Sequence, residues 1–215
     1  MMKRIRIVTL SILLLGFTNL NWAQVSTPVK FQYDNLEEAL NFPEKVLRLD
    51  LSNQELDFSP LVFKKFVNLE YLSLKNDHFK EVPKEILELE SLRILDLSGN
   101  DFTELPENFF KLKNLEELYL NDEKNMNLPK TLNTLSKLPS LRSLHLENDA
   151  LKEIPIDISK LKTLESLYLN GNQIETIPAI VEQMDRLKYL EIYHNRIDPS
   201  LRLNNDPKGN MIIKF

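Results

Sequence analysis

The chain has 215 residues and no cysteine, which excludes disulfides, thiolate zinc sites and cysteine nucleophiles. Its formal net charge is −5, and the part beyond residue 23 carries −8, because the first 23 residues hold three basic side chains and no acidic one. An acidic chain without a basic run disfavours nucleic acid and anionic membranes as partners, since both attract positive charge.

Residues 1–23 differ in composition from everything that follows. Basic residues at positions 3, 4 and 6 precede a mostly apolar stretch over 7–17, and Asn21-Trp22-Ala23 offers a cleavage site before Gln24. This order is typical of a secretory signal peptide. We therefore expect an exported protein, periplasmic or extracellular, with no membrane insertion after signal removal. The alternative is an uncleaved anchor, which the short apolar length disfavours.

Two short segments are expected between the signal peptide and the rest of the chain. Residues 24–33 are interpreted as a linker. Asp34 and Glu37 then have the spacing of a capping box, and the apolar residues that follow fall on one helical face. Because the first coil of a stacked array exposes its core on the outer side, residues 34–45 are predicted to form a helical N-terminal cap.

A repeat of 23 residues organises residues 46–200, and residues 92–115 show it most clearly as L-x-x-L-x-L-x-x-N-x-F followed by Leu105-Pro106. The first apolar position recurs seven times, in steps of 23 residues with a single step of 26, at Val46, Leu69, Leu92, Leu115, Leu141, Leu164 and Leu187. A pair of apolar residues separated by one residue follows in each copy, which is the period-2 signature of a short strand with one buried face. A proline column accompanies the first six copies, at Pro60, Pro83, Pro106, Pro129, Pro155 and Pro178.

On these residues the chain resembles the leucine-rich-repeat family along most of its length. The resemblance implies an α/β repeat fold, a curved right-handed solenoid. A parallel β-sheet of about seven strands would line its concave face, and short helical or irregular segments its convex face. The ending Trp22-Ala23-Gln24 also resembles signal peptides of Bacteroidetes-type bacteria. Export without cysteine fits a bacterial source better than a eukaryotic extracellular repeat protein, whose caps in this family are usually rich in cysteine.

In this family an asparagine after each strand turns inward and bonds to backbone groups of neighbouring coils. Here that column reads Gln54, Asp77, Asn100, Glu123, Asp149, Asn172 and Asn195. A carboxylate accepts hydrogen bonds but does not donate them as an amide does, so the second, fourth and fifth repeats are predicted to have weaker turns.

The array departs from its pattern in the fourth repeat and at its end. The fourth repeat has Asn125 at an apolar position and three extra residues between Pro129 and Leu141. One interpretation is a bulge that a partner grips; the other, which we favour, is a tolerated insertion on the convex side. After the repeats, residues 201–215 contain a turn signal at 206–209 and are predicted to fold over the open end as a C-terminal cap.

The sequence contains no phosphate-binding loop, zinc-metalloprotease helix or nucleophile elbow. His145 and Glu147 share one face of a strand, but no third ligand has the spacing to complete a metal site. The carboxylates are scattered over every copy, as on a solvated surface. We therefore expect no enzyme activity, no cofactor and no metal.

The residues that alternate with the buried leucines are predicted to face the concave side, and from the fourth copy onward they become large and aromatic. The candidate binding residues are Tyr119, His145, Tyr168, Tyr189, Glu191, Tyr193 and His194. Tyrosine offers a large rigid contact area with a polar tip, which suits an interface. The alternative is that these rings only stack on one another as cross-strand pairs.

The function that these observations favour is binding of a protein or peptide on the concave face by an exported, non-catalytic leucine-rich-repeat protein. A second hypothesis is cell-wall or glycan binding through the concave aromatic rings. A remote third is a hydrolase whose site no motif identifies. The identity of the partner and the oligomeric state stay open.

Overall fold

The computed structural model describes residues 31–54, 59–198 and 211–215. Within them one parallel sheet contains nine strands that pair in chain order. The strands are β1 Gln32–Tyr33, β2 Arg48–Asp50, β3 Tyr71–Ser73, β4 Ile94–Asp96, β5 Glu117–Tyr119, β6 Ser143–His145, β7 Ser166–Tyr168, β8 Tyr189–Glu191 and β9 Ile212–Lys214. Equivalent positions of successive repeats lie side by side, as with Tyr119 beside His145.

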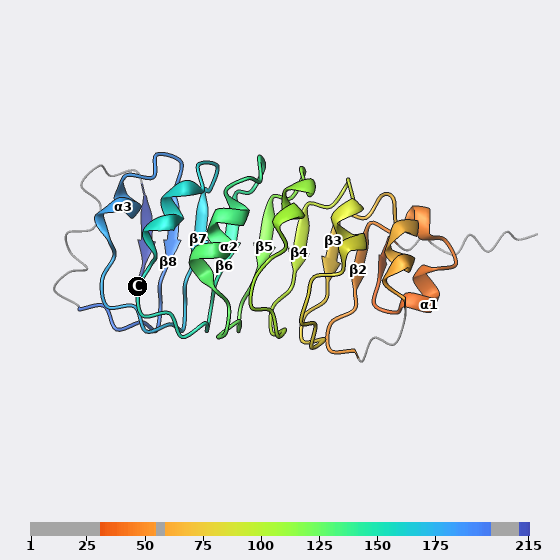
Figure 1. Cartoon of the computed structure of the whole chain (residues 1–215), viewed down its shortest axis with the longest axis horizontal. Helices are drawn as coiled ribbons and strands as arrows, with labels where there is room; N and C mark the ends of the chain where they lie inside the picture. The colour runs from red at the N-terminus through yellow and green to blue at the C-terminus, as the bar shows by residue number, and fades with distance from the viewer. Residues whose placement is uncertain (1–30, 55–58, 199–210) are drawn as a thin grey trace, which may run out of the picture.

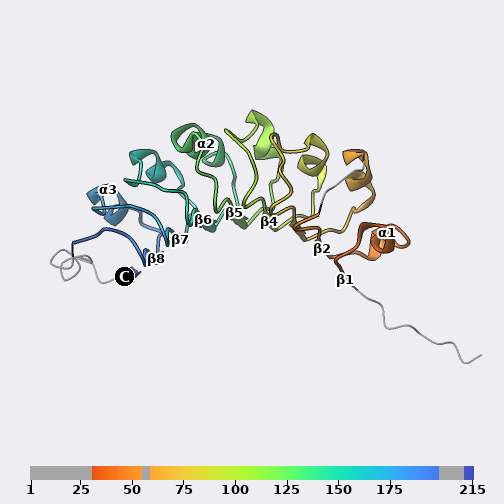
Figure 2. The ribbon, with the colours of Figure 1, turned by 90° about the horizontal axis from the view of Figure 1, so that it is seen from below.

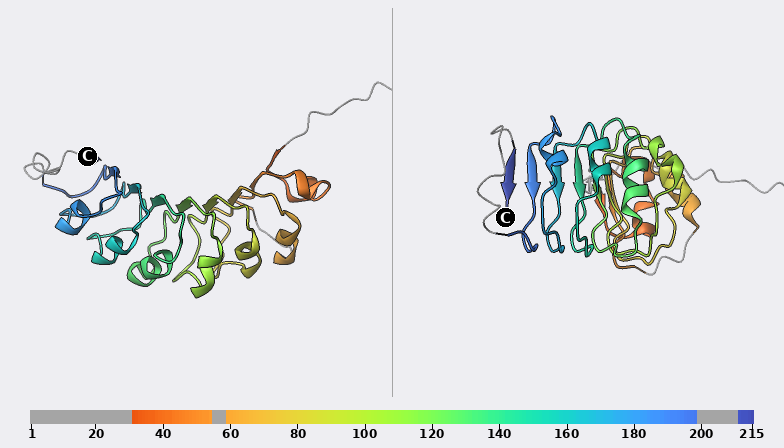
Figure 3. Two further views of the ribbon diagram at one scale, coloured as in Figure 1. Left: turned by 90° about the horizontal axis from the view of Figure 1, so that it is seen from above. Right: turned by 60° about the vertical axis from the view of Figure 1, so that its left-hand side comes forward.

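Short helical segments cover the opposite side. Figure 1 shows the strands side by side along the array, and Figure 2 and the left view of Figure 3 show an arc with the strands on its inner side and the helical turns on its outer side. These segments are α1 Leu36–Ala39, η1 Pro43–Lys45, η2 Pro60–Lys65, η3 Lys84–Glu88, η4 Glu107–Lys111, α2 Leu128–Leu135, η5 Ile156–Lys160 and α3 Ala179–Glu182. None of the described helices is long and apolar enough to cross a bilayer.

The core lies between the sheet and these helical segments. In every strand from β2 to β8 the central leucine is fully buried, while the residues on either side of it point away from the core. Phe63, Phe102 and Phe109 close the core from the convex side, and each is fully buried. A single repeat has no means of enclosing so much apolar surface, so stacking of repeats stabilises the fold. The predicted fold class, a leucine-rich-repeat solenoid, is confirmed.

Both ends of the array differ from the sequence expectation in detail. Gln32–Tyr33 forms strand β1 beside β2, although the sequence analysis assigned 24–33 to a linker. Helix α1 lies within the expected cap, but its N-cap is Asn35, whose side chain accepts from the Glu38 N–H, so the capping box of Asp34 and Glu37 is wrong by one residue. At the other end, β9 extends the sheet where a C-terminal cap is predicted, and residues 201–210 of that prediction lie outside the described residues.

The irregular fourth repeat places its extra residues on the convex side. There they lengthen the short helical turn of other repeats into the eight-residue helix α2, which the Asn127 side chain caps by accepting from the Lys130 N–H. Asn125 is exposed, and the neighbouring Met126 packs against the core in its place. This position agrees with a tolerated convex insertion, and the sheet passes the fourth repeat without interruption.

The inward column after the strands uses amides and carboxyl groups differently. The Asn100 amide donates to the carbonyls of Leu74 (2.8 Å) and Leu97 (2.7 Å), and its oxygen accepts from the Phe79 N–H (2.9 Å). Asn172 and Asn195 make the equivalent donor bonds in their repeats. The amide thus joins two consecutive coils on both its donor and its acceptor side.

The carboxyl groups of the same column accept backbone bonds while buried. Glu123 accepts from the Asn100 N–H (2.8 Å), and Asp149 accepts from the Glu123 N–H (2.7 Å). Burial is the main cause that raises the pKa of Glu123 to about 8, of Asp149 to about 7 and of Asp77 to about 6. The second oxygen of Asp77 is buried and has no hydrogen-bond partner among the described residues.

Candidate binding face

Strands β5 to β8 bring most of the predicted site residues onto one concave surface. Because parallel strands lie about 4.8 Å apart and these are in register, side chains at the same repeat position are immediate neighbours. We call this surface the aromatic–acidic face and define it by Glu117, Tyr119, His145, Glu147, Tyr168, Tyr189, Glu191 and Tyr193.

Three rings on this face form a continuous stack. The centroids of Tyr119 and His145 lie 3.8 Å apart with planes 14° from parallel, and those of His145 and Tyr168 lie 4.1 Å apart at 2°. Tyr189 follows at 5.5 Å from Tyr168 with a 50° tilt. The interpretation that the rings stack across strands therefore holds for the first three. His145 is only 7% exposed, since both of its faces are covered.

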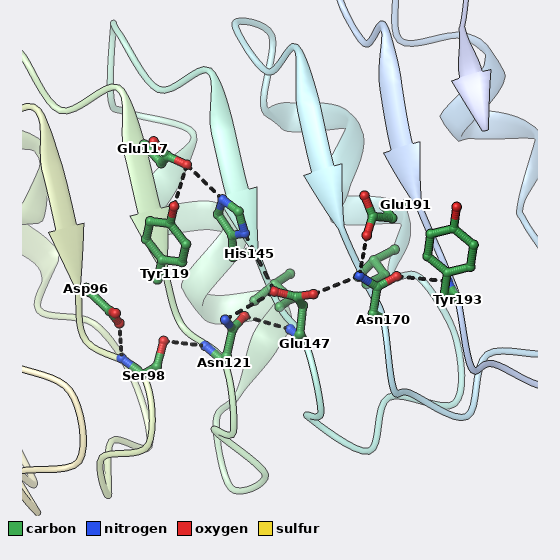
Figure 4. Close-up of polar contacts among 12 residues, drawn as sticks. Asp96, Ser98, Glu117, Tyr119, Asn121, His145, Glu147, Asn170, Glu191 and Tyr193 are labelled. Atoms are coloured by element: carbon green, nitrogen blue, oxygen red, sulfur yellow. Dashed lines mark hydrogen bonds and ion pairs between the residues drawn. The ribbon is translucent and has the colours of Figure 1, made fainter. Parts of the chain in front are cut away.

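Glu117 holds two rings of this stack, Tyr119 and His145, by hydrogen bonds (Figure 4). Its Oε1 accepts from the Tyr119 hydroxyl at 2.8 Å and from His145 Nε2 at 2.9 Å. Because a carboxylate only accepts, Nε2 carries the hydrogen. The bond from His145 is the main cause that lowers the pKa of Glu117, against the effect of burial. Burial and the bond to Glu117 raise the pKa of Tyr119, so its hydroxyl stays protonated as a donor.

Two asparagines, Asn121 and Asn170, hold the carboxylates of Glu147 and Glu191 (Figure 4). Neither asparagine is among the binding residues that the sequence predicts. The Asn170 amide donates to Glu147 Oε1 and to Glu191 Oε1, each at 2.8 Å. The Asn121 amide reaches Glu147 Oε2 at 3.3 Å, and the Asn121 and Asn170 carbonyl oxygens accept from the N–H groups of Glu147 and Tyr193. The signal for both was in the sequence, since they occupy the column that contains Glu147 and Tyr193.

The C-terminal part of the face is the most accessible. The Tyr189 hydroxyl donates to Glu191 Oε2 at 2.5 Å, and this bond is the main cause that raises the pKa of Tyr189 to about 12. Tyr193 is 37% exposed. His194, the remaining predicted site residue, lies in the turn after β8 with φ of 55° and is exposed. The structure thus brings six of the seven predicted residues together on the concave side of β5–β8, and His194 lies apart from them in the turn.

His194 occupies the repeat position at which the backbone turns after each strand, with positive φ. The residue before each inward side chain has positive φ in all seven repeats, and the others in this column are Asn53, Asn76, Gly99, Asp122, Asn148 and Gly171. Glycine, asparagine and aspartate are the residues that adopt this conformation most readily. A histidine here is the exception, and its place in the column follows from the repeat.

The N-terminal strands β2 to β4 present a different surface. The Arg48 guanidinium lies 3.9 Å from the centroid of the Tyr71 ring, a cation–π contact. Asp50 and Asp96 each accept from the N–H two residues later, at 3.1 and 2.9 Å. Positive and negative groups are mixed on this half.

The described residues show two hollows and no candidate metal cluster. Among residues 31–54, 59–198 and 211–215, no group of three His, Asp or Glu side chains is placed to hold a metal ion. Two hollows lie away from the aromatic–acidic face, one beside η5 and α3 and the other beside Val82 and Pro106. The arrangement on β5–β8 offers hydrogen-bond acceptors, ring edges and negative charge to a surface partner.

Comparison with known proteins gives the family. A family model described as "Leucine-rich repeat region" matches residues 43–139 and 129–205, and no curated protein matches the chain. A leucine-rich-repeat protein from Leptospira interrogans has a similar structure, with 27% identity, a TM-score of 0.52, and coverage of 78% of this chain and 54% of its own. A chain of the Drosophila Toll–Spatzle complex shares the fold at 18% identity and a TM-score of 0.66, with 86% of this chain and 26% of its own covered.

This chain spans about half of the Leptospira chain and about a quarter of the chain from the Toll complex. The two family matches together extend from residue 43 to residue 205 and so cover well over half of the sequence. The chain therefore belongs to the leucine-rich-repeat family.

Proposed function

We propose that this protein is an exported, non-catalytic scaffold that binds a protein or peptide partner on its aromatic–acidic face. Leucine-rich-repeat proteins are in general scaffolds rather than catalysts, and protein binding is their common role. The Drosophila chain that shares the fold comes from the Toll–Spatzle complex. These likenesses favour a binding function, and the residues of β5–β8 suggest where binding occurs.

The observation that carries the proposal is that the side chains of this face already hold one another in fixed positions without a partner. The rings of Tyr119, His145 and Tyr168 are held by stacking, and Glu117, Glu147 and Glu191 are held by hydrogen bonds to neighbouring strands. A partner that binds pre-ordered side chains loses less affinity to conformational entropy. Tyrosine also contributes much contact area with few rotatable bonds.

The stack favours a protein over a glycan as the partner. Aromatic residues that hold sugars use a free ring face, whereas both faces of His145 are covered by its neighbours. The hydroxyl edges of Tyr119 and Tyr189 already bond to carboxylates. What remains outward is the edges of the stacked rings, the exposed Tyr193 ring and hydrogen-bond acceptors, which together suit the polar and side-chain groups of a polypeptide.

Capture from the native envelope fraction tests the location of the site. The purified protein is compared with Tyr168→Ala and Tyr193→Ala, and with Asp50→Ala and Ser73→Ala as controls on the other half of the concave face. We expect at least one protein to be captured by the unchanged chain and by both controls and to be lost with the tyrosine variants, as quantified by mass spectrometry. Equal capture by all five would contradict the proposal.

Export is tested separately. Fractionation of the native cells, with mass determination of the protein, is expected to find a chain that begins at Gln24 outside the cytoplasm. A full-length chain in the cytoplasm would contradict export while leaving the binding proposal in place.

A further inference from the structure

We propose that the aromatic–acidic face recognises a polypeptide segment that carries lysine or arginine side chains. This inference rests on the proposed binding function and names the chemistry of the partner. It comes from how the charges of this face are balanced.

The carboxylates of the aromatic–acidic face are held without lysine or arginine. Glu117, Glu147 and Glu191 take their hydrogen bonds from tyrosine hydroxyls, asparagine amides and one histidine ring. None of the twelve concave positions of the fourth to seventh repeats is lysine or arginine: Glu117, Tyr119, Asn121, Ser143, His145, Glu147, Ser166, Tyr168, Asn170, Tyr189, Glu191 and Tyr193. Tyrosine and asparagine donors orient a carboxylate but leave its charge in place, and His145 is the one ionisable base beside them, 2.9 Å from Glu117 and 3.7 Å from Glu147.

The same strands show the opposite arrangement at the edge where they begin. There Glu116 pairs with Arg93 at 2.8 Å, and Glu165 pairs with Arg142 at 2.5 Å and with Lys188 at 2.9 Å. Acidic side chains along this edge are neutralised by bases one repeat away. The aromatic–acidic face has no such pair with lysine or arginine among the described residues, although Lys214 of β9 lies in register beside Glu191. Its excess of negative charge is therefore a local property of β5–β8.

The N-terminal half of the concave face contains the contact that we expect a partner to make. Arg48 lies over the Tyr71 ring, and burial together with the charge of the neighbouring Asp50 raises the pKa of Tyr71. Tyr189 likewise bonds to an acidic neighbour, Glu191, and Tyr193 follows Glu191 by two residues, yet no cation contacts either ring among the described residues. A lysine or arginine of the partner would supply the missing cation, with a carboxylate and a ring edge or face on either side.

The spacing of the carboxylates sets the size of the segment. Strands β5 and β8 are three strand spacings apart, about 14 Å, and an extended chain covers this distance in about four residues. Two or three cations within four to six residues would meet the three carboxylates. The Glu117 pKa, lowered mainly by the His145 bond, keeps that carboxylate charged into the acidic range.

Fluorescence anisotropy with labelled peptides tests the inference. The probe is a peptide in which lysine alternates with glycine, and the matched control has glutamate in place of lysine. We expect the lysine peptide to bind at least tenfold more tightly than the glutamate peptide at low salt, and to weaken as sodium chloride rises, because salt screens exposed charges. Equal binding of the two peptides would overturn the inference without the need for any variant.

Two matched double variants locate the effect. Glu147→Gln with Glu191→Gln removes two charges from the aromatic–acidic face, and glutamine keeps an oxygen that accepts from the Asn170 amide. Asp50→Asn with Asp96→Asn removes two charges from the other half. The first pair is expected to weaken the lysine peptide at least tenfold and the second less than twofold, with unchanged circular dichroism. Equal losses would mean that only net charge is sensed and would overturn the inference.

Spermine distinguishes a peptide site from a general polyamine site. It is expected to displace the lysine peptide only at concentrations at least tenfold above those of unlabelled peptide, and displacement at equal concentration would contradict peptide recognition.

If the lysine peptide fails to bind while Tyr168→Ala and Tyr193→Ala still abolish capture, the charge inference is wrong and the proposed function stands. If the Tyr168→Ala and Tyr193→Ala variants capture the partner as well as the unchanged chain does, the proposed function is wrong, and the charge inference that rests on it falls with it.

Discussion

The two halves of the concave face share a core and differ in what they show to solvent. In β2–β4 and in β5–β8 the central leucines are equally buried and the strands pair in the same register. Outside that core, the first half combines an arginine over a tyrosine ring with acidic groups. The second half stacks rings beside carboxylates that accept from tyrosine, asparagine and histidine side chains. The inward residues set the scaffold, so the outward residues are free to differentiate the surface.

The largest effects are expected where the two halves are alike. Leu95→Ala in β4 and Leu118→Ala in β5 each remove a fully buried side chain, at a cost of about 2–5 kcal/mol in the free energy of unfolding. Urea unfolding measures both. Losses below half a kilocalorie at either site would show that the core is not continuous between the halves.

The inward asparagines provide the next comparison. Asn100 and Asn172 make equivalent bonds in the two halves, to Leu74 and Leu97 and to Leu146 and Leu169. Replacement of either by alanine leaves buried carbonyl groups without a donor and is expected to cost about 1–3 kcal/mol in urea unfolding. A large difference between the two would mean that the turns of the halves are not equivalent.

The halves should differ in their response to pH, because the inward column of the second half holds two carboxyls, Glu123 and Asp149, with pKa values of about 8 and 7, whereas the first half holds one, Asp77, at about 6. The pKa of Glu123 is raised from 4.5 to about 8 by burial, with Asp149 and Asp101 as acidic neighbours. The folded state therefore binds more protons than the unfolded state between pH 4.5 and about pH 8. The contribution of this carboxyl to the free energy of unfolding is fully present below pH 4.5 and is lost as the pH rises to about 8.

Glu123→Gln tests this pH response. Urea unfolding between pH 5 and pH 8 is expected to show a smaller fall in stability for the variant than for the unchanged chain, by roughly 1–2 kcal/mol. An identical pH profile would show that the Glu123 carboxyl is ionised in the folded protein.

The smallest expected effect concerns His194. Its φ of 55° is costly for a residue with a side chain, and glycine takes the same place in the third and sixth repeats. His194→Gly is therefore expected to stabilise the protein by about 0.5–1 kcal/mol in thermal unfolding and to leave capture of the partner unchanged. Loss of capture would instead place His194 in the binding site, as the sequence predicts.

Sequence periodicity was sufficient for the scaffold. The 23-residue spacing predicts which leucines are buried and that Tyr119, His145 and Tyr168 share a face, because both follow from strand alternation. The end strands were missed, since Gln32–Tyr33 and Ile212–Lys214 carry no paired leucines. Asn35 and Asp34 are both good caps, and only the extended backbone of Asn35 decides between them.

The details of the site depend on distances that a sequence does not give. The roles of Asn121 and Asn170 arise because their amides reach carboxylates one repeat away, and the raised pKa of Glu123 arises from burial. The turn position of His194 could be predicted from the sequence, because asparagine, aspartate or glycine occupies the same position of the other six repeats. Comparison of all columns, and not only the concave ones, would have found it.

The most direct test of the central claim is the affinity of the captured partner, measured by isothermal titration calorimetry, for reciprocal variants of the two halves. Tyr168→Ala and Tyr193→Ala are each expected to weaken binding by about 1–3 kcal/mol with unchanged circular dichroism, whereas Asp50→Ala and Ser73→Ala change it by less than about 0.5 kcal/mol. The reverse pattern, with the tyrosine variants silent and the controls weakened, would place recognition on β2–β4 and contradict the account.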